Sequence, residues 1–447
     1  MGQIQTTQLG LGDLKGLAEL VLDEARRQGA TSAEVDVSVN SGLSVTARLG
    51  AVETLEHHKD QGVAVTVYLG TRKGSSSSSD LHAGALKETV RAACRIARYT
   101  ADDECAGLAD AALMAHDYPD LDLDHPWNLS AEQAIGVAIE CETAARDTDP
   151  RISNSEGATV SHLRGTAVYG NTHGFIGGYR ATRHSLSCAV IGKQMNHMQR
   201  DYWYSVARDS RLLDSPQTVG RIAAERTLKR LGARRLGTCQ APVLFEAGVA
   251  RSLLGHFVGA VSGGALYRKA SFLLDHAGKQ VFPNFAHIHE QPHLKRAMGS
   301  APFDDEGVAT QPRDLVIGGV LQGYVLSSYS ARRLGLKSTG NAGGVRNLIF
   351  DPGTCDLAGL MKQMDTGLLM TELIGHGVNM VTGDYSRGAA GFWVEGGEIQ
   401  YPVEEITIAG NLKDMFLGLQ AVGNDIDKRG NIRSGSILIE RMTVAGE

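Results

Sequence analysis

The chain has 447 residues and a formal net charge of −6, with 44 Lys and Arg against 50 Asp and Glu. Its 42% hydrophobic and 21% charged residues are typical of a folded globular protein and exclude a wholly disordered chain. It lacks a run of about 18 apolar residues, which argues against a membrane-spanning helix. The 54 glycines exceed the roughly 31 that average usage would give, which indicates many turns or close backbone contacts.

Cysteine usage and charge bear on the compartment and the partners. The six cysteines form no C-x-x-C pair, and the first residues (MGQIQTT) carry no export signal. Both features favour a cytoplasmic protein with reduced thiols. A mildly acidic chain without a long Lys/Arg run offers no electrostatic footprint for DNA or an anionic membrane, so neither partner is expected.

The N-terminal stretch predicts a helix followed by strands. Residues 13–28 place apolar side chains at helical spacing. Four runs that alternate apolar and polar residues, with Gly or Asn between them, then predict an antiparallel meander: residues 33–39, 43–49, 52–56 and 62–69. Residues 72–79 (RKGSSSSS) fit either a linker or a polar strand, and a helix is expected over residues 86–98.

The middle of the chain shows the same order of elements. Residues 101–128 are acidic and contain two prolines, as expected for a surface crossing between subdomains. Ser130-Ala-Glu-Gln matches a helix capping box and predicts a helix to about residue 145. Short β-like runs at residues 158–161, 165–169, 183–192 and 200–206 come next. A helix is expected over residues 216–231.

Beyond residue 241, a helix is expected over residues 249–261, and glycine pairs interrupt short strands. The pairs at residues 318–319 and 396–397 predict tight hairpin turns with positive φ. The elements together predict an α+β fold with a mixed N-terminal half of antiparallel sheets and flanking helices. We expect an N-terminal subdomain (1–125), a central subdomain (126–240) and a C-terminal glycine-rich β domain of barrel or sandwich type (241–447).

Residues His289-Glu290-Gln291-Pro292-His293 match the H-E-x-x-H pattern of zinc peptidases. That pattern binds metal only when a helix places both histidines on one face. Pro292 lacks an N–H and clashes with the preceding turn, so one helix does not accommodate both histidines. His287 adds a possible ligand, but a polar surface loop between residues 285 and 294 is the favoured interpretation.

His376, Asp384 and Ser386 lie close together in sequence and have the residue types of a base, an orienting acid and a nucleophile. No G-x-S-x-G elbow accompanies them, which favours turn-forming roles for the aspartate and the serine. Arg387 could bind a carboxylate or pair with Asp384. The glycine-rich segments lack phosphate-binding fingerprints, so nucleotide binding is not expected.

Several longer segments carry a further pattern: residues 70–81 (GTRKGSSSSSDL), 267–275 (YRKASFLLD), 328–340 (SYSARRLGLKSTG), 382–395 (TGDYSRGAAGFWVE) and 401–415 (YPVEEITIAGNLKDM). In order and spacing, they resemble the TldD/TldE (PmbA) metallopeptidase family, and its TldE-type subunit in particular, over nearly the entire chain. The resemblance implies a cytosolic peptidase in which a TldD and a TldE chain pair and cut unfolded or leader-bearing polypeptides. An older label of the family is modulator of DNA gyrase.

In the TldD subunit of this family, two histidines of an H-E-x-x-x-H segment and a cysteine hold the metal, and the glutamate is the base. Placed on that segment, this chain has Gly255 and Ala260 at the histidine positions, His256 at the glutamate position and Ser434 at the cysteine position. Gly and Ala offer no ligating atom, and a serine hydroxyl is a poor zinc ligand. The resemblance implies no cofactor in this chain and zinc in a TldD-like partner.

The leading hypothesis is a metal-free subunit that shapes a chamber shared with a TldD-like chain and holds an unfolded polypeptide, with strand edges adding backbone hydrogen bonds. Residues expected to contact substrate or partner are His256, Tyr267, Arg268, Asp384, Ser386 and Arg387. A homodimer in the absence of the partner is left open. The alternatives are an independent hydrolase using Ser386 and a non-enzymatic regulator that binds a protein such as DNA gyrase.

Overall fold

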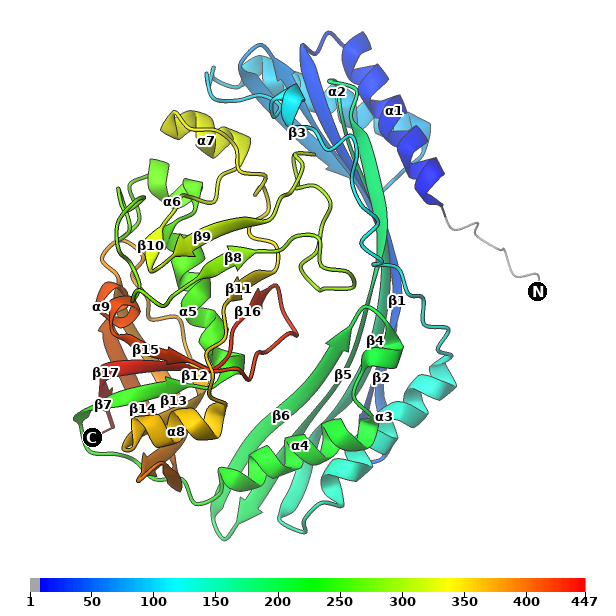
Figure 1. The fold of residues 1–447 in the computed structure, drawn as a ribbon. Coiled ribbons are helices and arrows are strands. Elements are labelled where there is room, and N and C mark those ends of the chain that lie inside the picture. Colours follow the sequence, from blue (N-terminus) through cyan, green and yellow to red (C-terminus); the bar gives the residue numbers. More distant parts are fainter. Residues whose placement is uncertain (1–8, 447) are drawn as a thin grey trace.

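Two β systems build the structure, one from each half of the chain (Figure 1). The computed structural model describes residues 9–446. The first half forms a long curved antiparallel sheet, and the second half forms a barrel and a smaller sheet that lie on its concave side. Within the described residues, no helix combines the length and the apolar character needed to cross a membrane.

The long sheet has the strand order β3-β2-β1-β4-β5-β6. Its strands are β1 (Ser32–Arg48), β2 (Ala51–Leu69), β3 (Arg72–Ser78), β4 (Ile152–Asn171), β5 (Ile176–Gln194) and β6 (His197–Ala207). The central strand β1 pairs with β2 on one side and with β4 on the other along most of its length. The strands on both sides of residue 125 therefore share one sheet, while the division into two subdomains there stays a prediction.

The expected meander of short strands is wrong in its number of strands. The runs 33–39 and 43–49 belong to β1, and the runs 52–56 and 62–69 belong to β2. Gly42, which lies between two of the predicted runs, is inside β1 and not in a turn. The residue there is glycine because a Cβ would stand 2.3 Å from the His162 carbonyl oxygen of β4. Close approach of a neighbouring strand, and not chain reversal, explains this glycine.

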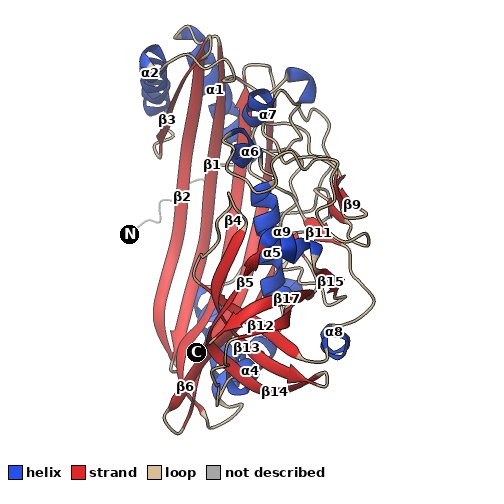
Figure 2. Cartoon of the chain, turned by 90° about the vertical axis from the view of Figure 1, so that its left-hand side faces the viewer, coloured by secondary structure: helices blue, strands red, loops and turns tan. Residues whose placement is uncertain are grey.

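Four helices cover the convex face of the long sheet (Figures 1 and 2). They are α1 (Leu11–Arg27), α2 (Ala83–Tyr99), α3 (Ala131–Arg146) and α4 (Pro216–Lys229). Odd-numbered residues of β1 point to this face, so that Val35 and Val37 pack under α1 and α2 while Val45 packs under α3 and α4. The predicted capping box of α3 is confirmed, since the Ser130 hydroxyl accepts the Gln133 N–H at 3.2 Å.

Residues 72–79, which fit either a linker or a polar strand in the sequence, contain β3, which pairs with β2. Its place is set by Gly74, where a Cβ would stand 2.2 Å from the Ala93 carbonyl oxygen of α2. Ser75, Ser76, Ser77 and Ser78, which follow Gly74, pair with residues 63–66 of β2, so that β3 forms the edge of the sheet. Short 3₁₀ turns at Ala111–Leu113 and Ser210–Leu212 occur in the connecting segments.

A closed five-stranded barrel forms the centre of the C-terminal half, which confirms the barrel-like expectation. It consists of β7 (Cys239–Phe245), β12 (Gly367–Ile374), β13 (Asp384–Glu395), β14 (Glu398–Asn411) and β17 (Ile437–Ala445). The strand order β14-β13-β12-β7-β17 closes through pairing of β14 with β17, and β15 (Leu419–Val422) adds to β17. Gly396 and Gly397 have φ of 61° and 75° in the β13–β14 turn, as predicted for this pair.

The smaller sheet has the order β10-β9-β8-β11-β16. Its strands are β8 (Ile288–Glu290), β9 (Arg313–Ile317), β10 (Val320–Leu321), β11 (Leu348–Phe350) and β16 (Ile432–Arg433). The helices of this half are α5 (Ala247–Ala260), α6 (Gly263–Tyr267), α7 (Ser328–Leu334), α8 (Leu357–Met364) and α9 (Leu412–Leu417). Barrel, small sheet and α5 share one hydrophobic core that includes Phe245, Phe257 and Phe350.

Candidate functional site

Helix α5 carries three of the positions at which the sequence predicts a functional difference. It begins directly after β7, where the Ala247 N–H donates to the Ser436 hydroxyl at 3.0 Å. One face of α5 is apolar and buried in the core, with Leu253, Leu254 and Phe257. The partly exposed side of the helix holds Gly255 and His256.

The three positions that would hold a metal in the resembling subunit have different surroundings. Among the described residues, nothing lies within 4 Å of the place that a Cβ on Gly255 would take. Ala260 and Ser434 are both 0% exposed. The Ser434 hydroxyl donates to the carbonyl oxygen of Gly435 at 2.8 Å. One position therefore opens to space and two are enclosed by protein.

Side-chain chemistry, and not spacing, distinguishes the first two positions, because Gly255 and Ala260 keep the five-residue separation of the histidines in H-E-x-x-x-H. Neither side chain has a ligating atom, and the Ser434 hydroxyl is engaged with its own backbone. These residues do not fit a zinc ion.

His256 lies instead beside two polar side chains of β13. Its ring meets that of Tyr385 edge to face, with centroids 6.0 Å apart. Burial and the nearby Arg387 charge lower the pKa of His256, and burial raises the pKa of Tyr385 to about 12 although Arg387 opposes that rise. Three buried polar atoms have no hydrogen-bond partner among the described residues: His256 Nε2, the Tyr385 hydroxyl and Arg387 Nε. Such unpaired groups are costly, so they are suited to a ligand that completes their hydrogen bonds.

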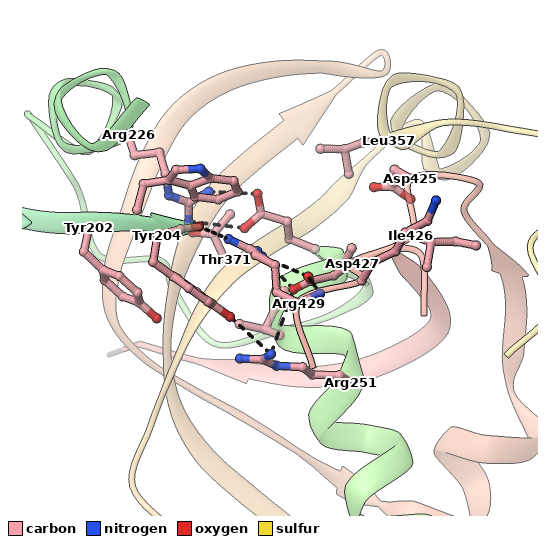
Figure 3. Close-up of a pocket in the computed structure, with 16 residues that line it drawn as sticks. Tyr202, Tyr204, Arg226, Arg251, Leu357, Thr371, Asp425, Ile426, Asp427 and Arg429 are labelled. Carbon is pink, nitrogen blue, oxygen red and sulfur yellow. Dashed lines mark hydrogen bonds and ion pairs between the residues drawn. The ribbon is translucent and has the colours of Figure 1, made fainter. Parts of the chain in front are cut away.

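A cavity of about 360 Å³ lies at the N-terminal end of α5, between the long sheet and the C-terminal half (Figure 3). Strand β6 contributes Tyr202, Trp203 and Tyr204 to its lining, and the segment before β16 contributes Asp427 and Arg429. The Arg429 guanidinium lies 4.2 Å from the Trp203 ring centroid and 4.3 Å from that of Tyr204. Side chains from both halves of the chain therefore meet in one wall of the cavity.

Charged pairs surround these aromatic rings (Figure 3). Asp427 accepts from Arg429 Nε at 2.9 Å and Nη2 at 3.0 Å. Burial alone would raise the pKa of Asp427, but the hydrogen bonds and charge of Arg429 hold it below its usual value. Arg226 donates to Glu246 at 2.9 Å, and Arg251, 4.0 Å from Asp427, reaches the Tyr204 hydroxyl at 3.3 Å. The cavity thus offers aromatic surface and both signs of charge.

Sequence reasoning did not find the residues of this cavity. Trp203 and Arg429 are separated by more than 200 residues. The run Asp201-Tyr-Trp-Tyr predicts a strand and carries no motif that predicts a cavity. The available signal is the density of aromatic residues in that strand, Tyr202, Trp203 and Tyr204.

His376, Asp384 and Ser386 do not assemble into a proton relay. The Asp384 carboxylate accepts from the Thr382 hydroxyl at 2.6 Å and from the Asn411 amide at 3.2 Å, and these hydrogen bonds lower its pKa. His376 and Ser386 are exposed. In the part of the chain that the structure describes, no hydrogen bond joins the three side chains. The aspartate acts locally, in the turn that leads into β13.

Tyr267 and Arg268 lie at the end of α6, in a different place from His256. Arg268 donates to the Tyr267 hydroxyl at 3.1 Å, and the guanidinium of Arg333 in α7 lies 5.5 Å from the same ring. Tyr329 meets the ring edge to face and donates to Asp103 at 2.8 Å. This cluster connects α6 and α7 to the segment that follows α2.

The expected loop between residues 285 and 294 is wrong at its centre, because Ile288–Glu290 form β8. Glu290 is buried and accepts from Arg313 at 2.6 Å, while His293 contacts the Thr310 hydroxyl at 3.1 Å. The two histidines of the H-E-x-x-H match therefore lie apart. His287 and His289 are stacked instead, with ring centroids 4.9 Å apart.

Comparison with known proteins identifies the family. Residues 33–97 match the PmbA/TldA metallopeptidase domain 1, residues 124–231 its central domain and residues 238–446 its C-terminal domain. The chain belongs to the PmbA/TldD metallopeptidase family. A "Metalloprotease PmbA" of Escherichia coli O157:H7 is 52% identical over 93% of this chain and 92% of its own length. A "Metalloprotease PmbA homolog" of Haemophilus influenzae is 49% identical over 97% of this chain and 96% of its own.

Solved structures share the whole architecture of this PmbA/TldD family member. A proposed modulator of DNA gyrase from Bacteroides thetaiotaomicron has a TM-score of 0.93 at 28% identity and covers 98% of this chain with all of its own. TldE from Thermococcus kodakarensis has a TM-score of 0.83 at 18% identity, covering 96% of this chain and 100% of its own. The second likeness is one of fold.

Proposed function

We propose that this chain is the TldE/PmbA-type subunit, without a catalytic metal, of a cytoplasmic TldD/TldE metallopeptidase, active in cleaving unfolded or leader-bearing polypeptides only with a TldD-like partner. Zinc and the catalytic base belong to that partner. This chain contributes surface for the substrate and shapes the shared chamber.

The observation that carries the proposal is the set of residues at the metal positions of the resembling subunit. Gly255 and Ala260 supply no ligand, and Ser434 is buried with its hydroxyl bonded to the neighbouring backbone carbonyl. His256 stands where the glutamate base would stand, and burial and the Arg387 charge lower its pKa. A hydrolytic metal centre has no ligands here, whereas the family is one of metallopeptidases.

Two features support a role in holding substrate. The unpaired polar atoms of His256, Tyr385 and Arg387 offer hydrogen bonds to a peptide carbonyl or carboxylate. The cavity of Figure 3 offers aromatic faces and charged groups to a side chain of an extended polypeptide. Both lie along α5, one at each end.

The test is reconstitution. The chain is purified alone and together with the TldD-like chain of the same organism, and cleavage of an unfolded polypeptide is followed with zinc in the buffer. We expect cleavage by the pair and none by this chain alone. Zinc-dependent cleavage by the lone chain would contradict the proposal, as would full activity of the partner without it.

Variants of this chain in the reconstituted pair test the substrate role. Arg251→Ala removes a cation from the wall of the cavity, whereas Arg221→Ala removes an exposed cation of α4 that pairs with Glu225. A rise in KM for Arg251→Ala, with Arg221→Ala unchanged, is the expected result. Equal kinetics of both variants would remove the cavity from the substrate path.

A second candidate function rests on the relative from Bacteroides thetaiotaomicron, which is named for DNA gyrase. A non-enzymatic regulator would form a stable complex with gyrase without peptide turnover by the reconstituted pair. Co-purification with gyrase in the absence of any cleavage would favour this function over proteolysis.

A further inference from the structure

A polar cluster lies on the face of the small sheet that points away from the core. In β8, Ile288 is buried, so the residues on either side of it, His287 and His289, point to the opposite face. Asp351 follows β11 opposite His287 and donates its N–H to the His287 carbonyl at 3.0 Å. On the other side, Asp314 of β9 pairs with His289. Three neighbouring strands thus bring two imidazoles and two carboxylates together.

The side chains of this cluster are in contact. Asp351 receives hydrogen bonds from both histidines, at 2.6 Å from His287 Nδ1 and 3.0 Å from His289 Nε2. The other nitrogen of His287 lies 2.8 Å from the Asp314 carboxylate. His287 is 36% exposed and His289 17%, so the cluster is held by the sheet and is reached from solvent.

We propose that His287, His289 and Asp351 form a binding site for a divalent transition-metal ion such as zinc. One ligand atom from each lies within 4.8 Å of those of the others. Tetrahedral zinc has bonds of about 2.0–2.2 Å to imidazole nitrogen and carboxylate oxygen, so its ligand atoms stand about 3.3 Å apart. Rotations of partly exposed side chains suffice to close this difference.

Charge and ligand type agree with such an ion. Two neutral imidazoles and the carboxylates of Asp351 and Asp314 balance the two positive charges of the metal. The mixed nitrogen and oxygen donors favour zinc or a similar ion over magnesium or calcium, which prefer oxygen alone. Gln291, whose amide lies 3.0 Å from His289 Nδ1, fixes the orientation of that ring. Water supplies the fourth ligand, and Asp314, on the other ring nitrogen of His287, orients that imidazole.

The bound ion would join β9, β8 and β11 on their solvent side, where hydrogen bonds between side chains now connect them. Its role is to stabilise the small sheet and, through Glu290 on the opposite face, the contacts of that strand with Arg313. The site is separate from the positions at Gly255, Ala260 and Ser434, and it stands independently of the proposed function.

The test measures metal retained by the full chain. The protein is treated with chelator, loaded with zinc chloride and dialysed against metal-free buffer, and zinc is then counted by mass spectrometry. We expect one zinc per chain in the wild type and a loss of at least about tenfold in affinity for His287→Ala and Asp351→Asn. His293→Ala is the matched control, because that histidine belongs to the same sequence motif but bonds to Thr310.

Thermal unfolding gives a second readout. Zinc should raise the melting temperature of the wild type and of His293→Ala, and it should leave that of His287→Ala unchanged. Circular dichroism of the metal-free variants checks that they are folded. Absence of retained zinc in the folded wild type overturns the proposal, and so does equal retention by His287→Ala, which would place the ion on cysteines or other groups.

Discussion

Replacement of Arg429 by alanine tests how the two halves of the chain are joined. Arg429 follows β15 in the C-terminal half, and its guanidinium lies between Asp427 and the rings of Trp203 and Tyr204 on the long sheet. The Asp427 side chain is 4% exposed and that of Arg429 20%. Arg429→Ala leaves the carboxylate of Asp427 in the interior without its main partner.

The size of the effect follows from these contacts. Breaking a buried ion pair from one side costs about 3–5 kcal/mol, and the lower end applies because Arg251 remains 4.0 Å from Asp427. Loss of a partly desolvated guanidinium from two aromatic rings adds about 1 kcal/mol. We expect the free energy of unfolding to fall by about 4 kcal/mol.

The loss depends on pH with a definite sign. In the wild type the folded pKa of Asp427 is lowered, so its contribution is present above the unfolded pKa of about 3.9 and is lost as the pH falls through the folded value. In Arg429→Ala burial acts with little opposition, and protonation of Asp427 relieves the unpaired charge. The difference between wild type and variant should therefore shrink between about pH 7 and pH 4.

Urea unfolding followed by circular dichroism measures this difference from the midpoint Cm at constant m. Asp149 and Arg151 supply a matched control, because they form the same bidentate pair two residues apart, with Nε and Nη2 at 3.0 and 2.8 Å, but at the surface and without aromatic rings. Arg151→Ala should change stability little. A loss in Arg429→Ala no larger than that in Arg151→Ala would refute the reasoning.

Three further predictions concern four other residues. Gly255→Ala should raise the melting temperature, because its Cβ meets open space in a helix and alanine gains about 0.5–1 kcal/mol there. Gly220→Ala, also in a helix, should lower the melting temperature and reduce the free energy of unfolding by about 1–3 kcal/mol, since its Cβ would stand 2.1 Å from the Cys141 carbonyl oxygen. Equal shifts of the melting temperature in the two glycine variants would contradict this account. Ser386→Ala in the reconstituted pair should cleave an unfolded polypeptide at the wild-type rate, and an abolished rate would restore the serine hydrolase. Burial raises the pKa of Asp304 to about 6 against the hydrogen bonds it accepts, so its ionisation should cost stability as the pH rises from about 4 to above 6, by up to about 3 kcal/mol; urea midpoints of wild type and Asp304→Asn that change in parallel with pH would contradict it.

Local sequence signals predicted the elements whose causes are local. The capping box at Ser130 and the Gly396-Gly397 turn act within four residues, and both occur where the sequence places them. The merging of two short runs into β1 depends on β4, more than 100 residues away, which pairs along β1 and occupies the space that a side chain at Gly42 would need. Periodicity records which face is buried and does not record how far a strand continues.

The residues of the candidate site also fall into those that the sequence predicted and those that it did not. Gly255, Ala260 and Ser434 were found by resemblance, because each has a counterpart at a fixed place in the sequence pattern. The cavity at Trp203 and Arg429 was missed, since its walls come from the two halves of the chain and neither segment has a motif of its own. The H-E-x-x-H match pointed to the right stretch with the wrong residues, because a strand pairs His289 with His287 and a helix would pair it with His293.

Because β1 lies at the centre of the long sheet, its two edges are paired at different times during synthesis. Its hairpin with β2 can form as soon as both strands emerge, but its other edge waits for β4, whose last paired residue is Asn171. At about 5–20 residues per second, the roughly 120 residues between them occupy the ribosome for on the order of 6–25 s. During that interval a long row of backbone donors and acceptors stands open to other chains. The exposure of this edge to other chains therefore falls before the first barrel strand, β7, has been synthesised.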